Sequence, residues 1–326
     1  MYNAAHAPSG IKVRVNMNNT YIVNYGGFLV DFSCAFTAEY KLYLGISIGL
    51  LFIVTTFGNS LVLLCICKYR QQFKGSYYIL IGNLALTDLL FGVVSILLIA
   101  DFVFSELEGN VTFCVVRALG VLMTYSSSLL TLLAISVDRF MAVVFPMKHM
   151  WQSKMTRVFY GAIILIWCVP FGLTAVYWII MDSITKQANV VCRNGAIIPK
   201  LVDIGALSAL FLQIIVNTIL YSIIVHRLRT RPFQTPKSAA KTKRKTTLMI
   251  SVSVLFSLCW LPFMVCTIVP YAAPNLTQSA FCVREYIVVL GYMNSSINWL
   301  LYALSNKKLR TSFKVVFVRN VSSGVA

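Results

Sequence analysis

Residues 114–145 read CVVRALGVLMTYSSSLLTLLAISVDRFMAVVF, an apolar run that begins with a cysteine and carries the charged pair Asp138-Arg139 near its end. At 1.5 Å per residue in a helix, Cys114 and Arg139 lie about 37 Å apart, roughly one bilayer with its headgroups. A charge inside a membrane costs about 2.5–3.5 kcal/mol even on insertion scales, so such residues usually serve a function. The stretch therefore predicts a membrane-spanning helix with a functional arginine at one end.

Six further apolar runs have about the length needed to span a bilayer. The seven predicted spans are Leu42–Cys67, Tyr77–Ala100, Cys114–Phe145, Val158–Ile180, Leu201–His226, Thr246–Val269 and Tyr286–Leu304. Of the 326 residues, 58% are hydrophobic and only 12% are charged, whereas soluble domains carry about 25% charged residues. Because lipid offers no hydrogen bonds to the backbone, each run must be a helix. The chain is predicted to be an all-α membrane protein, a seven-transmembrane helix bundle.

The net charge of +18 would suggest a nucleic-acid partner in a soluble protein. The positions of the charged residues along this chain are better explained by its orientation in a membrane. Of the 28 lysines and arginines, 20 fall in four segments on one side of the predicted spans, and most acidic residues fall on the other side. This asymmetry is the positive-inside rule, and it places the N-terminus outside the cell. We therefore expect no nucleic-acid partner.

Three regions follow from these spans. Residues 1–41 are expected to form an extracellular tail, residues 42–305 the seven-transmembrane domain, and residues 306–326 an amphipathic helix with a cytoplasmic tail. The basic sequence Lys307-Lys308-Leu309-Arg310, followed by Phe313, is typical of a short eighth helix that lies on the inner leaflet. The N-terminal residues show no signal peptide, so we expect the first span to act as the targeting signal.

The cysteines fall into two groups. Four lie on the predicted external side, and we expect the pairs Cys114–Cys192 and Cys34–Cys282. The other five lie in apolar runs and are expected to be buried packing residues: Cys65, Cys67, Cys168, Cys259 and Cys266. Glycosylation sequons that fall on the predicted outside begin at Asn18, Asn110 and Asn275.

Each span also carries a characteristic motif. In chain order the motifs are Gly58-Asn59-Ser60-Leu61-Val62; Asn83-Leu84-Ala85-Leu86-Thr87-Asp88; Cys114 with Asp138-Arg139-Phe140; Trp167; Tyr221; Phe256 with Cys259-Trp260-Leu261-Pro262; and Asn294-Ser295 with Asn298 through Tyr302. In this order they resemble the rhodopsin-like (class A) G-protein-coupled receptors over most of the chain. The resemblance implies a plasma-membrane receptor that binds an extracellular ligand and activates heterotrimeric G proteins through movement of the sixth helix.

Four positions depart from the family pattern. Phe140 replaces the usual tyrosine, Gln213 stands where many members have proline in the fifth helix, and Trp299 stands where the seventh helix normally has proline. Without that proline the seventh helix should kink less. Thr242 replaces the acidic residue that in some members pairs with the arginine of the third helix, and we expect its absence to raise basal activity.

Asp88 is the one carboxylate deep among the predicted spans. Burial favours a neutral acid that is hydrogen-bonded to its neighbours. The resemblance instead places Ser128, Asn294, Ser295 and Asn298 around Asp88 and implies an allosteric sodium ion that favours the inactive state. Because hard oxygen ligands suit a small hard cation, we expect the ion to bind there.

A second group of residues is implied by the resemblance to couple the receptor to its G protein. Asp138 is expected to hold Arg139 at rest, and the released arginine is expected to meet Tyr221 and Tyr302 and to face the G protein. Met147 matches an apolar side chain that enters a pocket on the G protein.

The sixth helix is expected to contain a two-state hinge at Trp260 and Pro262. A proline breaks the helical hydrogen-bond ladder, and the large side chain beside it can swing. Allosteric transitions require a bistable element of this kind.

The ligand site is expected between the external halves of the helices. On the third helix Arg117, Val121, Thr124 or Tyr125, and Ser128 recur at helical spacing and share one face. The predicted ligand-contacting residues are Arg117, Val121, Tyr125, Trp260, Phe263, Thr267, Val288 and Tyr292.

Two ligand classes are disfavoured by single residues at this site. Val121 holds the position at which the family's amine receptors carry aspartate, and Tyr292 holds that of the retinal-binding lysine. We therefore expect a non-amine small molecule, a lipid or a short peptide. Arg117 is expected either to grip an anionic group or, as a solvated rim charge, to pair with Glu106 or Glu108.

Other functional classes have less support in the sequence. The three histidines are scattered without metal-ligand spacing, and no phosphate-binding glycine loop or nucleophile elbow occurs, so we predict no enzyme. A seven-helix transporter or channel would be expected to show internal repeats or a ring of charges inside the membrane. A decoy receptor that binds ligand without coupling is the remaining alternative, and Trp299 favours it.

Overall fold

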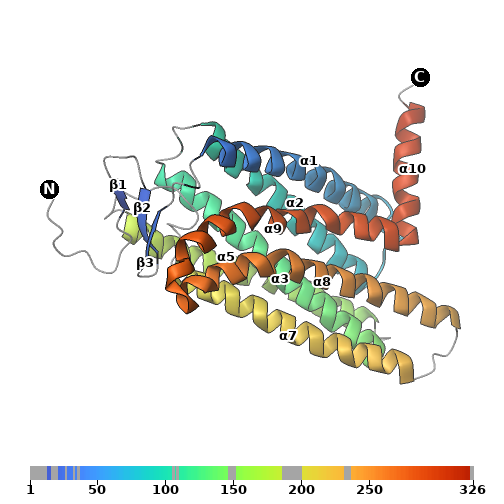
Figure 1. The fold of residues 1–326 in the computed structure, drawn as a ribbon. Helices are drawn as coiled ribbons and strands as arrows, with labels where there is room; N and C mark the ends of the chain where they lie inside the picture. The colour runs from blue at the N-terminus through green and yellow to red at the C-terminus, as the bar shows by residue number, and fades with distance from the viewer. Residues whose placement is uncertain are drawn as a thin grey trace.

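The structure is a computed structural model. It describes residues 13–15, 21–25, 28–31, 34, 37–104, 107, 110–145, 152–185, 200–230 and 236–323. Within these ranges seven helices are long and apolar enough to cross a membrane, which confirms the predicted helix bundle. These seven helices run side by side (Figure 1).

The described helices are longer than the predicted spans. Their bounds are α1 Ala38–Lys68, α2 Ser76–Val103, α3 Val111–Val144, α5 Gln152–Thr185, α7 Lys200–Thr230, α8 Pro236–Ala272, α9 Thr277–Ser305 and α10 Lys307–Ser323. A short 3₁₀ helix, Pro274–Leu276, precedes α9. Polar residues that flank the apolar runs thus belong to the helices. The helices continue past the apolar runs because the backbone N–H and C=O groups of a helix remain hydrogen-bonded.

Helix α9 was predicted to begin at Tyr286 and begins nine residues earlier, at Thr277. Arg284 and Glu285 lie just outside the predicted span, but both side chains are buried in the first part of this helix. Their mutual ion pair makes that burial possible, because a buried charge needs a partner.

Part of the predicted extracellular tail, residues 1–41, has a regular structure in the described residues. Three short strands, β1 Val13–Val15, β2 Tyr21–Tyr25 and β3 Phe28–Asp31, form an antiparallel sheet in the order β1-β2-β3. Val13 pairs with Val23, and Val23 pairs in turn with Val30. This sheet lies at one end of the bundle, which we call the sheet end (Figure 1).

The short eighth helix is present as α10, which runs across the direction of the bundle at the other end, called here the α10 end (Figure 1). Leu309, Phe313 and Val316 are buried, while the basic residues Lys307 and Arg310 are exposed. This alternation gives the amphipathic pattern that the sequence predicted.

The outer surface of the bundle is apolar, as lipid contact requires. On α1 the side chains of Leu42, Leu50 and Ile53 are about 60% exposed. Cys67 and Cys168 are exposed on this surface as well, so the prediction that they are buried was wrong. Lipid is as apolar as the bundle core, so an apolar run does not tell which of its residues face inward.

Motif side chains hold neighbouring helices together. Trp167 Nε1 on α5 donates a hydrogen bond to Asn83 Oδ1 on α2 at 2.9 Å, and Asn83 Nδ2 donates to Thr131 Oγ1 on α3 at 2.8 Å. Asn59 Nδ2 on α1 donates to the backbone carbonyl of Ser295 on α9 at 3.1 Å. These bonds fix the rotation of the helices, and so decide which side chains meet at the bundle centre.

Candidate functional site

Asp88 lies at the centre of the bundle and is fully buried. Ser295 Oγ donates a hydrogen bond to its Oδ1 at 2.7 Å, and Asn298 Nδ2 donates to its Oδ2 at 2.9 Å. Ser128 Oγ bonds instead to Thr87 Oγ1, at 3.2 Å. Two of the four predicted cage residues therefore contact the carboxylate directly, and both come from α9.

The other two cage residues line a small cavity of about 10 Å³ together with Ser295. This cavity has the volume of about one water molecule. The buried oxygens Asn294 Oδ1 and Asn298 Oδ1 have no hydrogen-bond partner in the structure. Ser128, Asn294 and Ser295 thus bring oxygen atoms to the cavity, and the Asp88 carboxylate bonded to Ser295 and Asn298 lies beside it. Such a set of oxygen atoms suits a small hard cation. Within the described ranges, no group of three His, Cys, Asp or Glu could hold a metal ion.

Aromatic rings form the opposite wall of this cavity. Tyr125 on α3 packs edge-on against Trp260 on α8 with ring centroids 4.7 Å apart, and Phe256 stacks on Tyr125 at 6.0 Å. A Cβ atom at Gly291 would lie 2.9 Å from the Trp260 ring, so the absence of a side chain lets the indole reach α9. The predicted hinge residue Trp260 and three of the predicted cage residues therefore line one cavity.

The predicted ligand-contacting residues fall into two buried groups. Tyr125 and Trp260 belong to the main core, and Phe263 packs against it. Val121 and Val288 pack against a second cluster nearer the sheet end, which contains Tyr292 and Phe91. Phe91 and Tyr292 have ring centroids 4.7 Å apart.

The two polar residues of the predicted ligand set are also buried. Thr267 Oγ1 donates to its own helix, at the carbonyl of Phe263, and Arg117 is only 2% exposed. Arg117 is therefore not a solvated rim charge. Glu106 and Glu108, its alternative partners, lie outside the described residues.

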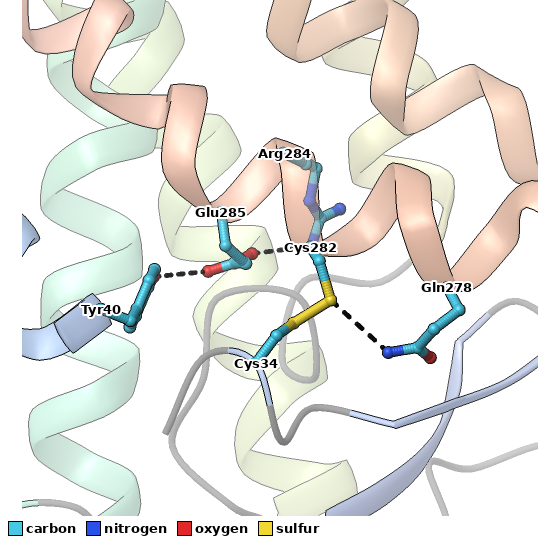
Figure 2. The surroundings of a disulfide bond; sticks show 6 residues. All are labelled: Cys34, Tyr40, Gln278, Cys282, Arg284 and Glu285. Atoms are coloured by element: carbon cyan, nitrogen blue, oxygen red, sulfur yellow. Dashed lines mark hydrogen bonds and ion pairs between the residues drawn. A yellow bond between two sulfur atoms is a disulfide. The ribbon is translucent and has the colours of Figure 1, made fainter. Parts of the chain in front are cut away.

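At the sheet end a covalent link joins the N-terminal region to α9. Cys34 and Cys282 form a disulfide, as predicted (Figure 2). Next to it, Arg284 Nη2 contacts Glu285 Oε1 at 3.2 Å, and Tyr40 Oη on α1 donates to Glu285 Oε2 at 3.1 Å. The Arg284 guanidinium also lies 4.9 Å from the centroid of the Phe281 ring. This buried network was not predicted, because Arg284 and Glu285 lie outside the predicted seventh span.

Other predictions at the sheet end can be located only in part. Cys114 is disulfide-bonded, and its predicted partner Cys192 lies outside the described residues. Asn110 and Asn275, two of the predicted glycosylation sites, are exposed near the ends of helices. Asn18 lies outside the described residues.

At the α10 end, Asp138 and Arg139 form a buried ion pair. Arg139 Nε donates to Asp138 Oδ2 at 2.9 Å, and Arg139 Nη2 bonds to the same oxygen. Ser76 Oγ, at the start of α2, donates to the other carboxylate oxygen. The arginine is thus held on its own helix, with α2 as a second anchor for the carboxylate.

At the α10 end, α8 is linked to α2 by a cation that lies over aromatic rings. Lys245 Nζ lies 4.3 Å from the centroid of the Tyr77 ring and 5.3 Å from that of Tyr78. The guanidinium of Arg139 lies 4.8 Å from the centroid of the same Tyr77 ring. Since Thr242 offers no charge, Lys245 provides a different attachment of α8, three residues further along the helix.

Two tyrosines that were expected to meet the arginine on activation lie elsewhere in this structure. Tyr221 Oη accepts a hydrogen bond from Ser136 Oγ at 2.9 Å and lies 3.3 Å from Ser253 Oγ, so it links α3, α7 and α8. Tyr302 is fully buried, and its hydroxyl has no hydrogen-bond partner. Met147, predicted to contact the G protein, lies outside the described residues.

Trp299 packs its indole against α1. The ring lies over Gly58, where an added Cβ atom would collide with it, and its centroid is 6.2 Å from that of Phe57. No proline occurs within α9, which runs without interruption to Ser305. The large side chain thus replaces the backbone kink by a contact between helices.

The chain matches one family over most of its length, described as 7 transmembrane receptor (rhodopsin family), at residues 58–302. Over 277 residues it is 28% identical to galanin receptor 2a of Danio rerio, and the aligned region covers 82% of this chain and 76% of that receptor. Tachykinin-like peptides receptor 86C of Drosophila melanogaster is 27% identical over 301 residues, covering 85% and 58% of the two chains. Sphingosine 1-phosphate receptor 1 of Danio rerio is 28% identical over 272 residues, covering 78% and 72%.

Proposed function

Because the chain belongs to the rhodopsin family of seven-transmembrane receptors, we propose that it binds an extracellular ligand and activates heterotrimeric G proteins. The sheet end faces the outside of the cell, and the α10 end faces the cytoplasm. The excess of lysine and arginine in the segments at the α10 end supports this orientation. The plasma membrane is the proposed location.

The observation that carries the proposal is the buried Asp138–Arg139 pair, which lies beside the contact of Lys245 on α8 with the ring of Tyr77 on α2. Arg139 is 4% exposed, so a G protein cannot reach it in this arrangement. Outward movement of α8 would separate Lys245 from Tyr77 and open the space over the arginine. Trp260 and Pro262 provide the hinge, because Pro262 lacks the N–H group that would tie it to the preceding turn.

The ligand is proposed to be a peptide or a lipid. Named relatives include receptors for galanin, for tachykinin-like peptides and for sphingosine 1-phosphate. The buried guanidinium of Arg117 suits an acidic group on such a ligand, and the apolar residues Val121 and Val288 suit its remainder.

A sodium ion is proposed to bind at Asp88. The carboxylate, the hydroxyl groups of Ser128 and Ser295, and the unpartnered amide oxygens of Asn294 and Asn298 would hold it. The ion would supply positive charge to a buried carboxylate, and would thereby stabilise the arrangement in which α9 packs against α2. No other residue role in the proposal depends on the ion.

Nucleotide exchange on purified G proteins tests the proposal. The receptor in lipid nanodiscs is mixed with representatives of the Gα classes, with galanin, a tachykinin or sphingosine 1-phosphate as probe. Arg139→Ala should lower basal and stimulated exchange at least tenfold while probe binding survives. Arg70→Ala, which removes an exposed arginine from the same end, should leave exchange unchanged.

Undiminished exchange by Arg139→Ala would show that the arginine has another role. A decoy receptor is the second candidate, and the contact of Trp299 with Gly58 favours it because this contact holds the inner part of α9 on α1. A decoy would bind a probe but support no exchange on any Gα class. The same assay therefore separates the two candidates.

The three exposed or external sequons are proposed to carry glycans. Treatment of the cell-expressed receptor with an N-glycosidase should lower its apparent mass, and Asn18→Gln, Asn110→Gln and Asn275→Gln should each remove part of that change.

A further inference from the structure

A cleft opens between the inner ends of α8 and α9. It has a volume of about 420 Å³ and is lined by Lys243, Arg244, Thr247 and Ser251 from α8 and by Leu304 and Ser305 from α9. The membrane-spanning parts of both helices end here, since the apolar segments are Thr242–Pro270 and Pro274–Ser305. The cleft therefore lies at the depth of lipid headgroups.

The charges of the cleft are not balanced by acidic residues of this chain. Lys243 and Arg244 are both exposed. No Asp or Glu occurs in residues 204–284 or after residue 285. Asp138, the acidic residue described at the α10 end, is already bonded to Arg139 and Ser76. An anion that binds Lys243 and Arg244 must therefore come from outside the chain.

Neutral hydrogen-bond donors lie among the two cations. The side chains of Thr247 and Ser305 line the cleft from its two sides, and Ser251 lies one turn beyond Thr247, donating its hydroxyl to the carbonyl of that residue. Cations together with hydroxyl groups are the usual partners of phosphate oxygens in proteins. Simple attraction of a basic segment to the membrane would need charges but no such concave arrangement.

An apolar side chain at the edge of the cleft favours a lipid over a soluble phosphate compound. Leu304 is 68% exposed, the highest value among the large hydrophobic residues described in the structure. A lipid whose headgroup fills the cleft can lay its acyl chains against this leucine. A soluble anion would leave it uncovered.

We propose that the α8–α9 cleft is a binding site for a phosphoinositide, an inner-leaflet phospholipid with phosphate groups on its inositol ring. Lys243 and Arg244 contact the ring phosphates, Thr247 and Ser305 donate hydrogen bonds, and Leu304 contacts an acyl chain. The site bridges the helix proposed to move and its neighbour, so bound lipid would resist their separation. Its occupancy does not depend on the identity of the extracellular ligand.

Native mass spectrometry of the full-length receptor in detergent tests the site directly. The receptor is mixed with phosphatidylcholine, phosphatidylserine or phosphatidylinositol 4,5-bisphosphate, and retained lipid is counted. The double variant Lys243→Gln/Arg244→Gln should retain at least tenfold less phosphoinositide than the wild type. The control variant Lys68→Gln/Arg70→Gln removes one lysine and one arginine from exposed positions at the same end. The amount of phosphoinositide that it retains should fall less than twofold.

A second variant removes a hydroxyl group without changing charge. Thr247→Val should lower phosphoinositide binding about threefold, and melting curves of all variants show whether the fold is kept. Equal loss in the two charge-removal variants would mean general attraction and would overturn the proposal. Equal retention of phosphatidylserine would do the same, and retention of soluble inositol 1,4,5-trisphosphate in preference to the lipid at equal concentration would rule out the lipid as occupant.

Discussion

The two ends of the bundle are held together by different kinds of contact. At the sheet end, a disulfide and a buried ion pair tie the N-terminal region and α1 to α9 (Figure 2). The α10 end also has a buried ion pair, but Asp138 and Arg139 both belong to α3 and Asp138 bonds to α2. Helix α8 is attached there through Lys245 to the rings of Tyr77 and Tyr78. A covalent bond and a buried charge pair are lost only at high cost, whereas a cation over a ring contributes about 0.5–2 kcal/mol.

This difference indicates which end can change shape. A receptor must keep its ligand-binding end intact while its other end opens, so strong contacts belong at the sheet end and exchangeable ones at the α10 end. The centre connects the two, because Trp260 and Ser295 line one cavity there and Ser295 is hydrogen-bonded to Asp88. Four measurements can break or sharpen this contrast.

The largest effect is expected from the buried ion pair at the sheet end. Glu285→Gln leaves the buried Arg284 without its opposite charge, and should lower the free energy of unfolding by about 3–5 kcal/mol. Thermal or denaturant unfolding in detergent measures the change. Glu39→Gln, at an exposed position in the first turn of α1, should have little effect. The double variant Arg284→Met/Glu285→Gln should recover most of the loss, and an unchanged melting point for Glu285→Gln would contradict the role of the pair.

The disulfide should give the next largest effect. Cys34→Ser/Cys282→Ser opens a link between residues 248 apart in sequence, and should cost about 2–4 kcal/mol of stability. Cys67→Ser serves as the control, because Cys67 is a free, exposed cysteine near the α10 end. Reducing agent should destabilise the wild type and leave the double variant unchanged. If both proteins respond equally, the strength of the sheet end has another source.

An intermediate effect is expected at the bundle centre. Sodium chloride should raise the melting point of the wild type relative to choline chloride at equal ionic strength. When the sodium concentration is tenfold or more above the dissociation constant, the added free energy of unfolding should be about 1–2 kcal/mol. Asp88→Asn and Ser128→Ala should lose this difference. Ser127→Ala should keep it, because the Ser127 hydroxyl bonds to the carbonyl of Ile166 on α5. A sodium effect that survives Asp88→Asn would place the ion elsewhere.

The smallest effect is expected at the α10 end and concerns activity. Lys245→Ala removes a contact of about 0.5–1 kcal/mol between α8 and α2, and should raise basal nucleotide exchange about two- to fivefold with little loss of stability. Lys68→Ala is the matched control, since Lys68 lies over the ring of Tyr69, its own neighbour in sequence. Basal exchange that stays at the wild-type level would mean that Lys245 does not restrain α8.

Much of the fold followed from the sequence alone. Seven apolar runs of spanning length and the motif in each gave the bundle and the position of Asp88 and Arg139, because hydrophobic length and local motifs are properties of short segments. The pair Cys34–Cys282 followed from assigning cysteines to one side of the membrane. The strands Val13–Val15, Tyr21–Tyr25 and Phe28–Asp31 were missed, since such short strands give little pattern.

Contacts between helices were the part that the sequence could not supply. Ser76 with Asp138, Lys245 with Tyr77, and Tyr40 with Glu285 each join residues more than 60 positions apart. Their meeting depends on how each helix is rotated, and packing of the whole bundle sets that rotation. One signal was available for Arg284 and Glu285. Two opposite charges next to an apolar helix can be buried together, so they need not mark a loop.

Gly58 and Trp299 occupy one shared volume, since the indole of one fills the space that a side chain at the other would need. Neither position can therefore vary alone without penalty. Enlarging residue 58 expels the ring, and restoring proline at 299 leaves a void beside α1. Substitutions at the two sites should be non-additive, and a lineage that regained the proline could tolerate alanine or serine at 58 where this protein cannot.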